Sequence, residues 1–522
     1  MEYNPVDLAT KWAQELKLAK RDDEKWIKRG KKVIRRYRDE RTGWSDNAKK
    51  YNILWSNVQT ILPALYGKTP KAQVERRYKD QDPVGRTASQ ILERALQFEL
   101  DHKGDFDNAV RCAITDRLLP GRGVCWVRFE AAEEIQTTEG PRQYECTPVD
   151  YVYWEDYRHS SARTWDEVTW VARRVYMSKQ DVVSRFGEEF SDVALTHEPI
   201  GLDEMVRNGE DVEGLRKAQI WEIWDKLTKT VTWVAEAYPK ALDHKDDPYG
   251  LDGFWPCPKP LFSTQTTDTI VPIPDFTLYQ DQADEIDMLT QRINLLVKAL
   301  KVVGVYDASQ VGVQRMLTDG VENTLIPVDT WAAFSEKGGI KGVVDFLPLD
   351  SVVLALQQCY LARDQAKQVI YEVTGLSDII RGASIASETA TAQQIKSQYA
   401  SLRLKDIQRS IAVFASEILR TKAQLMCDFY APETLIEMSG IMGTQDAQFS
   451  EQAMMMLKTE PGRNYRIEIA SDSLIEMDEQ TEKQSRMEFL QATGAFMEKA
   501  LPVAMQVPEM GPLMAEMLLF GV

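Results

Sequence analysis

The tripeptide Gly67-Lys68-Thr69 is the stretch of the chain that comes nearest to a nucleotide-binding motif. A phosphate-binding loop also needs a glycine five positions earlier, because successive backbone N–H groups must curl around the phosphate. Leu62 occupies that position, and Pro70 directly after Thr69 disfavours a helix that starts at the lysine. We therefore interpret the stretch as the end of a helix, with Gly67 as a left-handed cap and a strand after Pro70.

The remaining residue types that carry chemistry show no catalytic spacing. The six cysteines lack a C-x-x-C pair, which favours small buried side chains in a reducing compartment over disulfides or a zinc site. The four histidines are dispersed, and no H-E-x-x-H, G-x-S-x-G or G-x-G-x-x-G motif is present. We accordingly predict no catalytic residue, metal or cofactor, and no enzyme activity. The cysteines are Cys112, Cys125, Cys146, Cys257, Cys359 and Cys427.

Composition places the chain among globular proteins, with 43% hydrophobic and 27% charged residues. Its net charge of −17 indicates that the chain is not a sequence-reading DNA binder, and leaves open a protein that lets DNA pass without holding it. No apolar run approaches the ~18 residues that span a bilayer, and the charged N-terminus lacks an apolar signal region. We expect a soluble protein that is made inside a cell and binds no membrane.

The first part of the chain alternates between helical and β-rich stretches. Strands are indicated by aromatic and β-branched residues over 123–130, 144–157 and 165–177, and a hairpin over 217–238 with its turn near Lys226–Lys229. The tryptophans of these stretches are expected to pack a β-rich core or a subunit interface. Helices are expected over Leu8–Arg41, Asn47–Tyr66, Thr87–Leu100 and Phe106–Leu119.

Two long amphipathic helices follow and flank a small insert, Val305–Leu349. Each helix carries one apolar stripe at steps of three and four residues, so each needs a neighbour to cover it. The second helix, Ser351–Thr374, is expected to end at a left-handed Gly375. The stripe of the first helix consists of Ile286, Leu289, Ile293, Leu296, Leu300 and Val303. That of the second consists of Val352, Leu356, Cys359, Ala366, Ile370 and Val373.

The last part of the chain is predicted to be mostly helical. A very long helix is expected from Ser387 to Asp428, followed by a β-like segment over 464–474. From Asp478 onward the pattern is helical and rich in methionine, which favours an adaptable packing surface. The fold class is therefore α+β and predominantly α-helical.

The order of these elements resembles the portal (head–tail connector) proteins of tailed bacteriophages, most closely those of short-tailed phages. The likeness runs from about Trp26 to Asp472 and comes from several diffuse stretches in the right order. They are "YNILWSNVQTILPALYGKTPKAQV", the β-rich segment 146–187, and "SDIIRGASIASETATAQQIKSQ" with the long helix after it, to Met426. No single stretch is a catalytic motif.

The resemblance implies a portal fold that assembles as a ring, with a β-rich wing, two stem helices, a small α/β clip and a helical crown. The wing and N-terminal helices would take residues 1–275, the stem helices 276–304 and 350–375, and the clip 305–349. A tunnel loop would occupy 376–390, the long wing helix and its β segment 391–476, and a short crown 477–522.

The resemblance also implies the function. A ring, generally of twelve subunits, would sit at one vertex of the virion capsid after assembly in the host cytoplasm. Double-stranded DNA would be packaged and ejected through it. Its partners would be the terminase large subunit and later a tail adaptor protein, together with the major capsid and scaffolding proteins. ATP hydrolysis would belong to the terminase.

Within this interpretation, twelve copies give a ring charge of roughly −200, which repels phosphates and lets DNA slide. Four residues near the tunnel loop are our candidates for the DNA channel: Arg381, Ser384, Ser387 and Lys396. The two cations can equally be solvated or form salt bridges between subunits. Stem packing is assigned to Ile286, Leu289, Ile293, Leu296, Leu300, Val352, Leu356 and Ile370.

Two other functions remain open. The first is a different ring-shaped head–tail adaptor or scaffold; the insert between the two long helices argues against it, because adaptors are usually much shorter. A carboxylate-dependent nuclease or ATPase would need an acidic pair in space, and no spacing in the sequence singles one out.

Overall fold

The structure is a computed structural model of an α+β protein. It describes the chain except residues 1–3, 41–48, 77–81, 104, 132–134, 138–139, 143–144, 199–212, 301–303, 307–335, 337–343, 347–348, 376–389, 460–464, 470–486 and 488–522. The chain forms two compact units. The first contains residues 1–61 and 108–421, and the second residues 62–107 and 422–522.

The first unit begins with two helices, α1 (Pro5–Asp22) and α2 (Glu24–Tyr37), where the sequence predicted one. The prediction was wrong at Asp23, which separates the helices and is 3% exposed. Its carboxylate accepts a hydrogen bond from Arg122 at 3.0 Å. The break is favoured because Arg122 is fully buried and needs a counter-charge in the interior.

We call the described residues of the first unit before residue 280 the wing. Its largest sheet is five-stranded and antiparallel, with the strand order β12-β11-β10-β9-β8. The predicted hairpin is confirmed, since Asp225 lies opposite Thr230 across the turn. The predicted role of the tryptophans in the core is also confirmed: Trp126 and Trp224 lie in one buried cluster, while Trp170 meets Trp12 of α1 edge-on at 5.8 Å in another. The strands are β8 (Tyr157–His159), β9 (Trp170–Met177), β10 (Ala218–Asp225), β11 (Thr230–Ala235) and β12 (Ala241–Asp246).

A three-stranded sheet, β13-β2-β7, lies beneath helix α5 (Asp105–Leu118). At Gly123 a Cβ atom would come within 1.9 Å of the Ala113 carbonyl oxygen, so only glycine allows this close approach. The strands are β2 (Arg122–Val127), β7 (Val149–Val152) and β13 (Leu261–Phe262). Smaller elements around them are β3 (Glu130–Ala131), β4 (Ile135–Thr137), β5 (Gly140–Arg142), β6 (Glu145–Cys146) and α6 (Lys179–Phe186).

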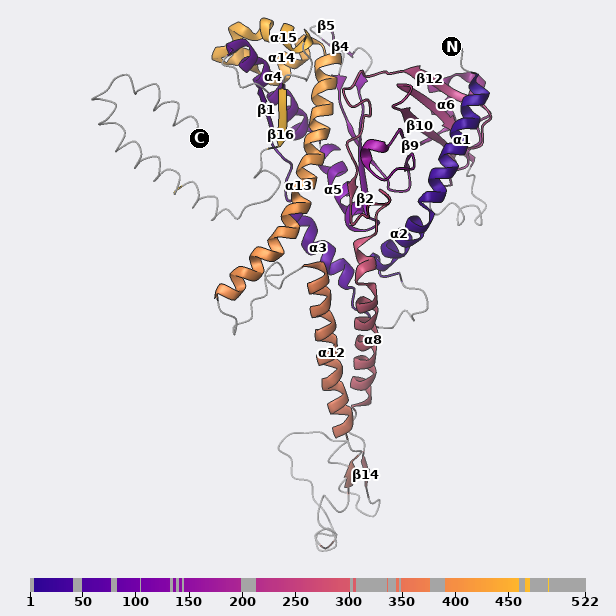
Figure 1. The fold of residues 1–522 in the computed structure, drawn as a ribbon, viewed down its shortest axis with the longest axis vertical. Helices are drawn as coiled ribbons and strands as arrows, with labels where there is room; N and C mark the ends of the chain where they lie inside the picture. The colour runs from indigo at the N-terminus through magenta and orange to yellow at the C-terminus, as the bar shows by residue number, and fades with distance from the viewer. Residues whose placement is uncertain are drawn as a thin grey trace, which may run out of the picture. The chain divides into compact units, whose positions relative to one another are not determined.

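A helical hairpin extends from the wing within the same unit. Helices α8 (Gln280–Ala299) and α12 (Asp350–Thr374) lie side by side (Figure 1). Strand β14 (Gly304–Tyr306) pairs antiparallel with β15 (Val344–Phe346) at the end of the hairpin away from the wing. The first unit also holds most of α13 (Ala390–Phe429).

The second unit packs helices α4 (Pro83–His102), α14 (Pro432–Ser439) and α15 (Ser450–Thr459). The strand predicted after Pro70 is confirmed as β1 (Ala72–Arg76), which pairs with β16 (Tyr465–Ile469). Inside this unit, Glu99 is 1% exposed and binds Lys422 at 2.7 Å.

Helix α3 (Ile53–Leu65) ends two residues before Gly67. The predicted left-handed cap is wrong, because Gly67 is not among the glycines of positive φ. The hydroxyl group of Thr69 instead donates a hydrogen bond to the Asp107 carboxylate at 3.3 Å. The structure describes no helix that is long and apolar enough to cross a bilayer.

The remaining short helical turns are 3₁₀ helices. They are η1 (Trp165–Glu167), η2 (Glu188–Phe190), η3 (Glu213–Leu215), η4 (Asp275–Leu278), η5 (Ile441–Gly443) and η6 (Gln445–Phe449).

The buried ion pair at the α1–α2 break predicts a large stability difference between two neighbouring aspartates. Asp23→Asn leaves the buried guanidinium of Arg122 without its carboxylate and should lower the free energy of unfolding by about 3–5 kcal/mol. The exposed neighbour provides the control, because Asp22→Asn should change stability by less than about 0.5 kcal/mol. Urea denaturation followed by tryptophan fluorescence measures both. Equal effects would contradict the role of Asp23.

Candidate functional site

One apolar side of each helix of the hairpin faces the seam between α8 and α12. Ile286 and Ile293 of α8 are buried, as are Cys359, Ala366 and Ile370 of α12. The other residues assigned to stem packing are half-buried in the single chain: Leu289, Leu296, Leu300, Val352 and Leu356.

Each helix of the hairpin also carries apolar side chains on the side away from the seam. On α8, Met288 is 60% and Leu295 58% exposed, and on α12, Leu354 is 59% and Leu361 58% exposed. Residues seven apart lie on the same line of a helix, so each pair forms a short apolar line facing away from the seam. Exposed apolar patches of this kind mark interaction surfaces. These four residues are not among the predicted packing residues, although their spacing of seven residues is visible in the sequence.

Arg36 of α2 clamps the root of α8. The Asp287 carboxylate is fully buried and accepts hydrogen bonds from Arg36 and, at 2.8 Å, from the Tyr51 backbone N–H. Arg36 also donates to the Asp284 carboxylate at 3.0 Å and to the Ala283 carbonyl oxygen at 3.2 Å. The hairpin is thus held to the wing by a buried, hydrogen-bonded charge. Arg36 and Asp287 are 251 positions apart in the sequence, so no local pattern predicts this contact.

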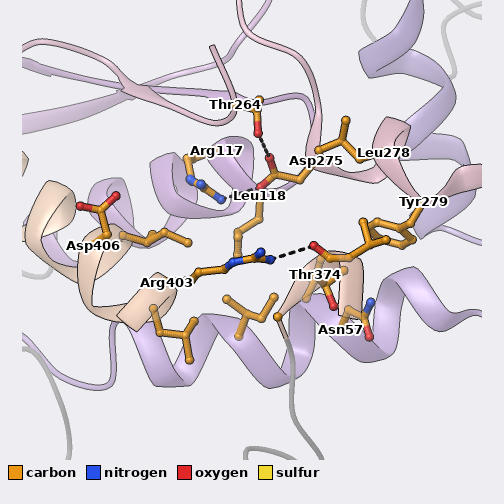
Figure 2. Close-up of a pocket in the computed structure, with 16 residues that line it drawn as sticks. Asn57, Arg117, Leu118, Thr264, Asp275, Leu278, Tyr279, Thr374, Arg403 and Asp406 are labelled. Carbon is orange, nitrogen blue, oxygen red and sulfur yellow. Dashed lines mark hydrogen bonds and ion pairs between the residues drawn. The ribbon is translucent and has the colours of Figure 1, made fainter. Parts of the chain in front are cut away.

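A pocket of about 370 Å³ lies where α12 ends, lined by residues of α3, α5, α12 and α13 (Figure 2). Arg403 of α13 donates a hydrogen bond to the Val373 carbonyl oxygen at 3.0 Å. Gly375 has a φ of 72°, which confirms the predicted left-handed cap, and a Cβ there would lie 2.9 Å from the Cδ atom of Arg403. Across the pocket, Arg117 binds Asp275 at 2.8 Å. The pocket therefore lies where α12 and α13 come together with α3 and α5.

Two buried groups with shifted pKa values lie inside the wing. Burial raises the pKa of Asp116 to about 7, although the Tyr151 hydroxyl group donates a hydrogen bond to its carboxylate. Burial, together with the nearby Arg122 charge, lowers the pKa of His159 to about 4. Both ring nitrogens of His159 are engaged, by Arg122 at 3.2 Å and by the Ser160 carbonyl oxygen at 2.9 Å. All of these contacts lie within the wing, so we infer that Asp116 and His159 contribute to its stability.

The candidates for the DNA channel lie largely outside the described residues. Arg381, Ser384 and Ser387 fall in the segment 376–389, and Lys396 lies on α13 at a position where side chains are not described. The proposed clip is described at β14, β15, Glu336 and Leu349, and the proposed crown only at Met487. Among the described residues, no group of three or more His, Cys, Asp or Glu side chains is placed to hold a metal ion.

Comparison with known proteins adds no relative. A scan against protein-family models and a search of curated proteins found no match to this chain.

The pKa of Asp116 predicts a pH dependence of wing stability. Its folded pKa of about 7 lies above the ordinary value of 3.8, so the folded state binds the extra proton between these pH values. The stability contribution of Asp116 is therefore lost as the pH rises from about 4 through 7. Relative to Asp116→Asn, the unchanged protein should lose about 2–4 kcal/mol over this range in urea titrations. A difference that stays constant with pH would refute the shift.

The clamp on α8 predicts a local loosening. Asp287→Ala removes the buried acceptor for Arg36 and for the Tyr51 N–H, and should destabilise the hairpin root by about 3 kcal/mol. Hydrogen exchange should become faster in α8 and stay unchanged in the wing strands. Asp284→Ala is the control, because this side chain is 63% exposed and its ion pair should contribute less than about 1 kcal/mol. Identical exchange in both variants would contradict the clamp.

Proposed function

We propose that this chain is a portal protein that forms a ring at one vertex of a bacteriophage capsid. Double-stranded DNA would be packaged and ejected through the ring, and the chain would hydrolyse nothing. The observation that carries the proposal is the hairpin with apolar residues on two sides. Its seam buries one side of each helix, while Met288 and Leu295 on α8 and Leu354 and Leu361 on α12 remain exposed in the single chain.

The two apolar lines favour a ring over a two-fold dimer. The lines belong to different helices, so the line on α8 of one copy can meet the line on α12 of the next. Such a head-to-tail contact leaves one line free at each end until the assembly closes, and closure of this kind produces rings. A two-fold dimer would instead require one surface patch to pair with itself.

The remaining parts of the proposal follow from the resemblance. The insert between the stem helices would dock the terminase large subunit and later the tail adaptor. Major capsid and scaffolding proteins would surround the ring, and Arg381, Ser384, Ser387 and Lys396 remain our candidates for residues near the DNA. The net charge of −17 per chain would keep the DNA mobile in the channel.

Cysteine cross-linking tests the head-to-tail contact. In a Cys112→Ser and Cys146→Ser background, which removes the two partly exposed native thiols, we introduce Leu295→Cys and Leu361→Cys in the same chain. Treatment of the assembled protein with a short bis-maleimide should give a ladder of covalent oligomers that ends at the complete ring. Each single cysteine variant should remain monomeric on the denaturing gel.

The outcomes separate the possible assemblies. Covalent dimers from Leu295→Cys or Leu361→Cys alone would indicate a two-fold contact and overturn the head-to-tail arrangement. A protein that stays monomeric at every salt and protein concentration would contradict the ring itself.

A further inference from the structure

Helix α2 is strongly basic in a chain that is acidic overall. Seven of its fourteen residues are basic and one, Glu24, is acidic, whereas the whole chain has a net charge of −17. The basic residues of α2 are Lys25, Lys28, Arg29, Lys31, Lys32, Arg35 and Arg36.

The basic side chains lie opposite the side that α2 buries. Trp26, Gly30 and Val33 are buried, and they fall on one stripe of the helix. The six basic residues other than Arg36, which holds the root of α8, are exposed. The solvent side of α2 is therefore almost continuously positive over the length of the helix, which is about 20 Å.

Most of this charge is not neutralised within the chain. Lys28 pairs with Glu24 at 2.7 Å and Lys31 with Glu155 at 2.9 Å. The other exposed cations form no ion pair with any carboxylate that the structure describes: Lys25, Arg29, Lys32 and Arg35. Like charges packed along one helix lower its stability, and a polyanion bound along this side would offset that repulsion.

The chemistry of the surface favours nucleic acid over the other polyanions. A membrane-surface helix inserts apolar side chains, and α2 has no large hydrophobic side chain exposed. Lysine is depleted at protein–protein interfaces, whereas protein–DNA interfaces are strongly positive. The length of α2 matches roughly six base pairs of duplex at 3.4 Å each.

We propose that the solvent face of α2 binds the phosphate backbone of double-stranded DNA without reading its sequence. This contact goes beyond the proposed channel, because it lies on a wing helix and would hold DNA where the rest of the acidic chain repels it. It does not depend on ring formation. The affinity should fall steeply with salt, because the release of counterions from the DNA drives this kind of binding.

The test compares two variants that each lose four positive charges. The first carries Lys25→Gln, Arg29→Gln, Lys32→Gln and Arg35→Gln on α2. The control carries Lys179→Gln, Lys217→Gln, Lys240→Gln and Lys259→Gln, at exposed positions elsewhere on the first unit. Fluorescence anisotropy with labelled 30-base-pair duplexes of two unrelated sequences, from 50 to 200 mM KCl, gives the affinity and its salt dependence.

We expect the unchanged protein and the control to bind both duplexes, and the α2 variant to bind about 100-fold more weakly or not at all at 50 mM salt. The slope of log K against log salt should become shallower by about 3–4 in the α2 variant, because each lost phosphate contact removes about 0.9. Light scattering and circular dichroism on the same samples show whether each variant still folds and assembles.

Three results would overturn the inference. Equal weakening by both variants would show that net charge, not α2, governs binding. An α2 variant that binds DNA normally but no longer assembles would make the surface a contact between copies. Binding of the unchanged protein to vesicles containing 30% phosphatidylserine, without binding to DNA, would assign the surface to a membrane. Loss of DNA binding with normal ring assembly would leave the proposed portal function intact.

Discussion

Two helices in a hairpin can bury only one side of each against the other, and this limit shapes the structure. Ile286 and Ile293 of α8 and Ile370 of α12 are buried, yet leucines and a methionine of the same two helices remain exposed. Apolar side chains at that density on a lone hairpin lower solubility and gain nothing in stability. In the proposed ring, each hairpin would supply the cover that the next one lacks.

Helix α2 connects the other parts of the first unit. Asp23 at its start neutralises Arg122 inside the wing, and Arg36 near its end holds Asp287 at the root of α8. Both contacts place a charge in the interior, where a lost partner is costly. A displacement of α2 would therefore disturb contacts both in the wing and at the hairpin. The cationic side of α2 faces the solvent.

Local patterns in the sequence predicted much of the fold. The β10–β11 hairpin, α12 with its Gly375 cap, and the strand after Pro70 each depend on spacing or turn chemistry within a few residues. The features that were missed depend on partners far along the chain. The break at Asp23 exists because Arg122 is buried about a hundred residues later, and the clamp on Asp287 needs Arg36. The apolar lines of the hairpin were visible in the spacing, but only the burial of the opposite sides shows that they remain uncovered.

Negative-stain electron microscopy of the purified protein, viewed along the particle axis, shows directly whether the chain forms a ring. We expect closed rings with a central channel and a single, twelvefold rotational symmetry. Particles that are only monomers or two-fold dimers under all assembly conditions would contradict it.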